Sequence, residues 1–133
     1  ERKFEMFTAY SSPEVNQFQR FSIASDVYAF GVSLWECFSY GEIPFHGMTN
    51  DQVREFSMEI SISSSFLNKD YQAIDERLSR PAYATSELYQ IMLHCWKHDP
   101  SQRPTFSQLE KQFDEVYYKS FLFFIFIEMS LLV

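Results

Sequence analysis

The chain has 133 residues, of which 46% are hydrophobic and 19% aromatic, and this composition excludes an intrinsically disordered protein. Its formal net charge of -7 argues against a nucleic-acid partner, because proteins that bind phosphate backbones present a basic surface. Cys37 and Cys95 are too few for a disulfide framework. Both lie in apolar patterns that predict burial in a reducing compartment.

Residues 1–21 have no steady periodicity and predict a loop with short turns. Within this loop, Pro13 followed by Glu14 suits the first turn of a short helix, where proline is tolerated and an acid is favoured by the helix dipole. The charged start "ERKFEMF" lacks the apolar region of a signal peptide, so a cytoplasmic location is expected.

The next predicted helix begins with Ser25 as its N-cap, runs to about Tyr40 and stops at Gly41. Almost all of its side chains are large and apolar, which is typical of the central helix of a domain rather than of a surface helix. It is too short to span a membrane, since a span takes about 20 apolar residues.

A capping box of Thr49 and Gln52 predicts that another helix starts there. Residues 57–71 are rich in serine and have neither a helical nor a strand period, so they are interpreted as an inserted loop. Because the insert interrupts the helix that follows Thr49, that helix is expected to be short.

Two amphipathic helices are predicted in the C-terminal half, and they make the chain mainly α. The first carries apolar side chains at helical spacing and is ended by Pro100. The second starts at a capping box of Thr105 and Gln108. The apolar positions are Leu88, Ile91, Met92, Cys95 and Trp96 in the first helix, and Phe106, Leu109, Phe113 and Val116 in the second.

Residues 117–133 change character, because every residue from Phe121 to Ile127 is large and apolar. The run is too short for a transmembrane span and is interrupted by Glu128. Three interpretations stay open: a hydrophobic anchor, a helix that docks on the domain, or sequence foreign to the fold. The residue bias of both this tail and the insert is also that of translated AT-rich non-coding sequence, so part of the chain could be a gene-model artefact.

Four stretches in order resemble the protein kinase family, and within it the tyrosine kinases. "SPEV" (12–15) is similar to the A-P-E motif that ends the activation segment. "SDVYAFGVSLWECFSYGEIPFHGMTNDQV" (25–53), "RLSRP" (77–81) and "CWKHDPSQRPTF" (95–106) are similar to tyrosine-kinase signatures. The resemblance implies that residues 1–116 form part of a kinase domain, namely its helical C-lobe without the N-lobe. The insert at residues 57–71 and the tail at residues 117–133 do not match the family pattern.

The resemblance also suggests a subtype. Ala9 stands where tyrosine kinases usually carry a basic residue, and together with "FSIASD" and "FSYG" it is similar to the Ack-type non-receptor kinases. Tyr10 stands where tyrosine kinases carry tryptophan and serine/threonine kinases an aromatic residue, whereas Trp35 and "CWKHDP" favour the tyrosine side.

The parts that perform kinase chemistry do not occur in this sequence. A Gly-rich phosphate loop cannot be built, because Gly31, Gly41 and Gly47 are the only glycines, and no H-R-D or D-F-G string is present. No catalytic residue, no metal ligand and no cofactor-binding residue is therefore expected, although the family uses ATP and magnesium. His94 and His98, spaced i, i+4, lack the glutamate and third ligand of a zinc site and are interpreted as surface residues.

The resemblance implies roles for individual residues. Glu14 and Arg103 would form a buried ion pair that fixes the end of the activation segment, and Asp26 would accept hydrogen bonds from the H-R-D backbone or simply cap its helix. Trp35 and Trp96 would be structural. The segment that receives the substrate residue after the phosphorylated one would consist of Phe7, Thr8, Ala9, Tyr10 and Ser11.

The function implied is that of the C-terminal portion of a protein tyrosine kinase, which transfers the ATP γ-phosphate to a protein tyrosine. The partner would be a tyrosine-containing protein substrate, and neither a nucleic acid nor a transmembrane span is expected. The alternative is a non-catalytic kinase-like protein that acts as a binding or regulatory module. An upstream H-R-D and D-F-G in the natural protein would favour the enzyme.

Overall fold

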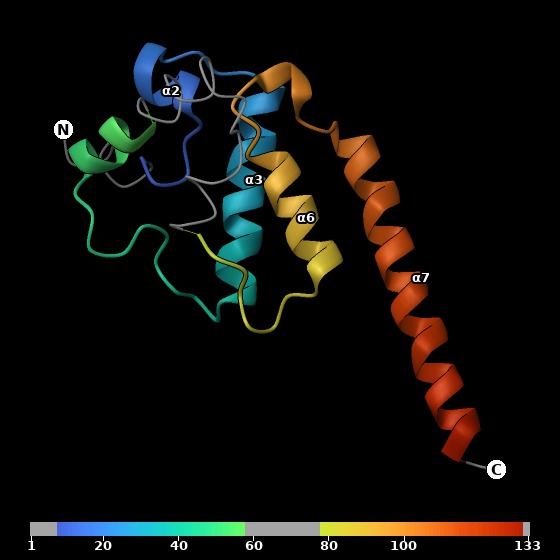
Figure 1. The fold of residues 1–133 in the computed structure, drawn as a ribbon. Helices are drawn as coiled ribbons and strands as arrows, with labels where there is room; N and C mark the ends of the chain where they lie inside the picture. The colour runs from blue at the N-terminus through green and yellow to red at the C-terminus, as the bar shows by residue number, and fades with distance from the viewer. Residues whose placement is uncertain (1–7, 58–77, 132–133) are drawn as a thin grey trace, which may run out of the picture.

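The computed structural model describes residues 8–57 and 78–131, and these are built from helices and loops with no strand. In chain order, the helices are α2 (Pro13–Phe18), α3 (Ile23–Phe38), a helix over residues 50–57, α6 (Ser86–Cys95) and α7 (Phe106–Leu131). The short 3-10 helix η1 (Pro100–Gln102) lies between α6 and α7. Helices α3 and α6 pack side by side, and α7 extends away from them to the C-terminus (Figure 1). The predicted mainly α architecture is confirmed.

Helix α3 starts earlier than the sequence suggested. Its N-cap is Ser22, whose Oγ accepts from the Ser25 N–H at 3.2 Å while the Ser25 Oγ accepts from the Ser22 N–H at 2.8 Å. This reciprocal pairing satisfies two backbone donors at the helix start. The predicted N-cap, Ser25, is therefore the third helical residue, and its prediction as the cap was wrong.

The end of α3 also differs from the prediction. The helix ends at Phe38, and Tyr40 adopts the left-handed conformation with φ 56°, a region usually reserved for glycine. The Gly41 N–H donates to the Glu36 carbonyl at 2.9 Å and the Tyr40 N–H to the Cys37 carbonyl at 3.3 Å. These two bonds form a Schellman motif in which glycine stands one residue beyond the left-handed position.

The core lies between α3 and α6 and is closed by the loop before α6 and the first turns of α7. Gly31 on α3 allows close approach, because a Cβ there would lie 2.6 Å from the Cys95 Cβ. Met92, Cys95 and Trp96, predicted to face the core, are all nearly inaccessible. The other members that are at most 2% exposed are Val27, Val32, Leu78 and Leu109.

The two cysteines differ in environment. Cys95 is fully buried as predicted, and burial raises the pKa of its thiol to about 12, since the thiolate would lose its hydration. Cys37 is exposed on α3, so its predicted burial was wrong. Its neighbours in sequence, Glu36 and Phe38, are half-buried, which shows that Cys37 lies on the outer edge of the helix.

Both predicted capping boxes are confirmed. The Thr49 N–H donates to Gln52 Oε1 at 2.8 Å, and the Thr105 N–H donates to Gln108 Oε1 at 2.9 Å, each with the reciprocal bond to the threonine hydroxyl. Pro13 is at the first position of α2, also as predicted. The predicted insert lies outside the described residues except for Ser57, which is buried and helical rather than part of a loop.

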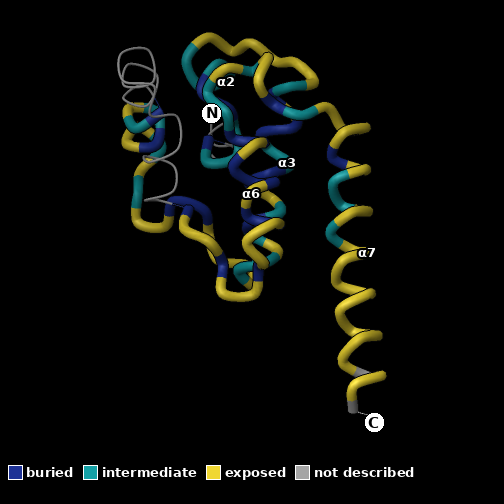
Figure 2. The backbone as a smooth tube through the Cα atoms, turned by 45° about the vertical axis from the view of Figure 1, so that its right-hand side comes forward, coloured by how far each residue is buried: buried dark blue, intermediate teal, exposed yellow. Residues whose placement is uncertain are grey.

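Helix α7 is buried only at its beginning. Leu109 is 2% exposed and Phe113 and Val116 pack partly against the core, but Phe106, predicted to lie in the same stripe, is 44% exposed. From residue 117 to residue 127 every side chain is exposed (Figure 2), so this part of α7 does not dock on the rest of the described chain. None of the described helices, α7 included, has both the length and the apolar character needed to cross a membrane.

Removing residues 117–133 should leave the stability of the lobe unchanged. The described part of this tail, residues 117–131, buries none of the side chains whose exposure is known, while its exposed Phe and Ile residues favour aggregation. We therefore expect a chain ending at Val116 to give a higher soluble yield and an unfolding midpoint equal to or above that of the full chain. The variant Leu109→Ala, which removes a buried contact on the same helix, should lower the midpoint in the same assay. A truncated chain that no longer unfolds cooperatively would show that the tail is part of the fold.

Candidate functional site

The segment before α2 is fixed to that helix by Asn16. The Asn16 side-chain amide donates to the Thr8 carbonyl and to the Ser11 carbonyl, both at 3.2 Å, and the Ser11 N–H donates to the Thr8 carbonyl at 3.3 Å. The Thr8 side chain is buried, whereas Ala9 is half-buried. The predicted peptide-receiving residues Thr8 to Ser11 thus form a turn of defined shape, and the fifth, Phe7, lies outside the described residues.

Tyr10 connects this turn to the central helix. Its hydroxyl donates to Glu36 Oε2 on α3 at 2.7 Å. Partial burial, together with the hydrogen bond to Glu36 and the negative charge of that carboxylate, raises the pKa of Tyr10 to about 12. The phenol is therefore a neutral hydrogen-bond donor at physiological pH.

A bidentate ion pair joins α2 to the loop before α7. The Arg103 guanidinium donates to Glu14 Oε1 at 2.7 Å and to Oε2 at 2.9 Å. The Arg103 side chain is completely inaccessible and that of Glu14 is 16% exposed. This planar two-bond arrangement is the geometry in which arginine binds a carboxylate most specifically.

The remaining donors of Arg103 are also paired. They reach the carbonyls of Lys97 at 2.7 Å, Ala24 at 2.9 Å and His98 at 3.2 Å, and the guanidinium lies 5.1 Å from the centre of the Tyr28 ring. One side chain thus holds together α2, the start of α3, the end of α6 and the loop before α7. A buried guanidinium is tolerated here because its charge and its donors are matched.

The pairing changes the acidity of Glu14. Burial by itself raises the pKa of this carboxyl, but the hydrogen bonds and positive charge of Arg103 outweigh it, and the pKa falls below the ordinary value of 4.5. Because the folded-state pKa is lowered, the pair contributes stability above that ordinary pKa. This contribution is lost as the pH falls through the folded-state value.

Asp26, the other acid with an implied role, has no such partner. It lies in the first turn of α3, is exposed, and forms no side-chain hydrogen bond with the described part of the chain. The capping role considered from sequence is taken by Ser22. The Asp26 carboxylate is thus exposed at the start of α3.

The two tryptophans are enclosed in the core, in different ways. Trp35 is 6% exposed and its indole N–H donates to the Ser79 carbonyl at 2.8 Å, which ties the loop before α6 to α3. Trp96 is 1% exposed, and its buried indole N–H has no partner among the described residues. That nitrogen faces Gly31, where a side chain would lie 2.8 Å away.

Side chains that could bind a metal ion are dispersed in the part of the chain that the structure describes. In the described ranges, no group of three or more His, Cys, Asp or Glu side chains could hold a metal ion. His94 is exposed and His98 half-buried, and no third ligand joins them within those ranges. The three glycines are dispersed and form no phosphate loop.

Sequence comparison defines the family. The profile of the family described as "Protein tyrosine and serine/threonine kinase" matches residues 1–113. The chain therefore belongs to the protein kinase family. This membership accounts for the order of the four motifs, and for the fold as the helical C-lobe of a kinase domain.

Several curated tyrosine kinases are similar to this kinase chain. It is 38% identical to the tyrosine-protein kinase SRK2 of Spongilla lacustris over 81% of the chain and 26% of the relative. It is 37% identical to the tyrosine-protein kinase Fer of Homo sapiens over 77% of the chain and 11% of the relative. With Srms of Mus musculus, a third tyrosine-protein kinase, the identity is 36% over 80% of the chain and 18% of the relative. The chain thus spans about a quarter or less of the length of these relatives.

Sequence reasoning missed two residues that position the turn at 8–11. Asn16 follows the S-P-E-V string and bears no motif of its own, so nothing in the sequence indicated its hydrogen bonds. Glu36 follows Trp35 within the string of α3 that resembles tyrosine kinases, and this resemblance was the one feature of the sequence that could have indicated a role for Glu36. The roles of Tyr10 and Glu36 are clear only from the hydrogen bond between their side chains.

Proposed function

We propose that this chain is the C-terminal helical part of the catalytic domain of a protein tyrosine kinase of the Ack-like, non-receptor type. The complete enzyme would transfer the γ-phosphate of ATP to a tyrosine hydroxyl of a protein substrate in the cytoplasm. The relatives described above support the tyrosine side, and Ala9 with the "FSIASD" string supports the Ack-like subtype.

The observation that carries the proposal is the bidentate bond between Glu14 and Arg103. Glu14 belongs to the string that resembles the end of an activation segment, and Arg103 to the signature before the last helix. A rigid link between these two places is what a kinase needs to present its peptide-binding segment in one position.

The role of this chain in catalysis would be to position the substrate. Residues 8–11 would form the platform that receives the substrate residue following the tyrosine, with Asn16 and Glu36 holding its shape. Asp26 would accept hydrogen bonds from the backbone of the catalytic loop. ATP and magnesium would be held by the Gly-rich, H-R-D and D-F-G elements of a complete kinase domain, because the residues described here do not provide them.

Phosphoamino-acid analysis of the natural protein tests the proposal. The longest natural protein that contains this chain should label tyrosine-containing peptides with radioactive phosphate and leave serine and threonine peptides unlabelled. The 133-residue chain alone should label neither above a heat-inactivated control. Labelling of serine or threonine would contradict the tyrosine assignment. If the natural protein transferred no phosphate to any peptide, this would favour the alternative of a non-catalytic binding module.

A further inference from the structure

The distal part of α7, residues 117–131, presents a large apolar surface to solvent. Ten large apolar side chains between Tyr117 and Met129 are between 38% and 71% exposed. This part of the helix extends away from α3 and α6 (Figure 1), and it lies beyond residues 1–113, which match the kinase family. A contiguous apolar surface of this kind on a folded chain indicates an interaction site.

One stripe along distal α7 has the spacing of a coiled coil. Tyr118, Leu122, Ile125 and Met129 follow one another at intervals of four, three and four residues, which is the repeat of the two apolar positions in a heptad. Because an α-helix has 3.6 residues per turn, these four side chains lie on one side of it. All four are exposed. They are called the apolar seam below.

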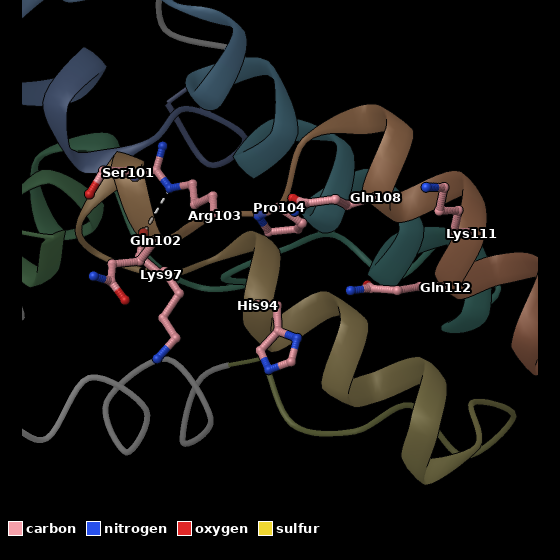
Figure 3. Close-up of a pocket in the computed structure, with 9 residues that line it drawn as sticks. All are labelled: His94, Lys97, Ser101, Gln102, Arg103, Pro104, Gln108, Lys111 and Gln112. Carbon is pink, nitrogen blue, oxygen red and sulfur yellow. Dashed lines mark hydrogen bonds between the residues drawn. The ribbon is translucent and has the colours of Figure 1, made fainter.

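The apolar seam faces away from the lobe. Leu109 and Val116, through which α7 contacts the core, lie on the opposite side of the helix by the same periodicity. The two positions that would extend the seam toward the lobe are Lys111, shown on the first turns of α7 in Figure 3, and Glu115, and both are exposed. A second helix can therefore cover the seam without displacing α6.

The side of distal α7 opposite the seam is more polar. It carries Ser120, whose hydroxyl donates to the Val116 carbonyl at 3.0 Å, and near its end Ser130, whose hydroxyl donates to the Ile127 carbonyl at 2.8 Å. Lys119 lies on the flank between this side and the seam. The seam itself contains neither a serine nor a charged residue, so it is the stripe best suited to burial against another helix.

The exposed area of the seam is close to what a stable dimer buries. The four seam residues and the flanking Phe121 and Phe126 are between 38% and 71% exposed. A large side chain has roughly 200 Å² of surface, so the six together offer on the order of 700 Å². A standard protein–protein interface buries about 800 Å² per partner. A second copy supplies the same stripe, because a two-fold interface pairs one surface with itself.

We propose that two copies of this chain associate through distal α7, with the apolar seam of one packed against the apolar seam of the other. A membrane surface fits the helix less well, because helices that lie on membranes carry several lysines or arginines on their polar side. Lys119 is the one basic residue between 117 and 131, and the net charge of -7 opposes binding to anionic lipids. Such pairing does not depend on phosphotransfer, so a chain without kinase activity would still form the dimer.

Sedimentation equilibrium of the full chain at several protein concentrations tests this. We expect a reversible equilibrium between monomer and dimer. Ile125→Glu should weaken dimerisation roughly tenfold or more, because it places a carboxylate in the seam. Ile127→Glu is the matched control: the two isoleucines are 38% and 39% exposed, but Ile127 lies opposite the seam. It should change the dimer dissociation constant less than about threefold, and a chain ending at Val116 should be a monomer.

Both variants should keep the unfolding midpoint of the lobe, since neither isoleucine is buried in it; this separates loss of the dimer from loss of the fold. A full chain that stays monomeric at every concentration would overturn the proposal. Equal weakening by Ile125→Glu and Ile127→Glu would also overturn it, because association would then be unspecific. A chain that is monomeric in solution but sediments with phosphatidylcholine vesicles would identify a lipid surface as the partner instead.

Discussion

Replacing Arg103 by alanine should lower the free energy of unfolding by about 3–5 kcal/mol, because Glu14 would be left partly buried without its partner. The carbonyls of Lys97 and Ala24 would lose their donors at the same time. Urea unfolding followed by circular dichroism measures the change. An effect of this size is a large fraction of the stability of an ordinary domain.

Two controls separate this effect from the loss of any basic side chain. Arg54→Ala removes an arginine whose side chain is 43% exposed and whose pair with Asp51 lies within one helical turn. Lys111→Ala removes an exposed lysine. Both should cost within about 0.5 kcal/mol, as is usual for surface positions. Arg103→Lys keeps the charge but not the planar fork, and it should fall between wild type and Arg103→Ala. Equal unfolding midpoints for Arg103→Ala and Arg54→Ala would show that the ion pair between Glu14 and Arg103 does not stabilise the fold.

Replacing Gly31 by valine should also destabilise the fold strongly. A Cβ at this position would lie 2.6 Å from the Cys95 Cβ and 2.8 Å from Trp96 Nε1, closer than packed atoms approach. Helices α3 and α6 would have to separate, and overpacking of this kind costs about 1–3 kcal/mol or more. The closest atom belongs to a Cβ, which cannot rotate away, so the strain falls on the backbone.

Ser33→Val is the matched control for this change. It introduces the same β-branched side chain on α3, at an exposed position. Its effect on the free energy of unfolding should stay within about 0.5 kcal/mol. A Gly31→Val variant as stable as Ser33→Val would show that α3 and α6 are not in close contact.

The sequence predicted the start of a helix correctly where a capping box marks it. The Thr49–Gln52 and Thr105–Gln108 boxes are each a self-contained set of two hydrogen bonds, so they form wherever the helix starts. The start of α3 was missed because Ser22 and Ser25 cap each other, and serine at the third helical position is a weaker signal than the usual glutamate. The end of α3 was placed late because Tyr40 takes the left-handed position that glycine normally fills.

Contacts between distant segments could be predicted only through the family resemblance. Glu14 and Arg103 are 89 positions apart, and no periodicity connects them. The bonds of Tyr10 to Glu36 and of Asn16 to the turn at 8–11 were not foreseen, because single side-chain hydrogen bonds leave no pattern in one sequence. The exposure of Cys37 was missed for a related reason: apolar neighbours predicted a buried helix on all sides, whereas α3 is covered by α6 on one side and is open on another.

A double-mutant cycle between Glu14 and Arg103 tests most directly the claim that this pair joins the segment before α3 to the helical core. The free energy of unfolding would be measured at pH 7 for Glu14→Ala, Arg103→Ala and the double variant. We expect a coupling energy of about 2 kcal/mol or more, with the double variant little worse than Arg103→Ala alone. Additive losses, with a coupling energy below about 0.5 kcal/mol, would contradict the account.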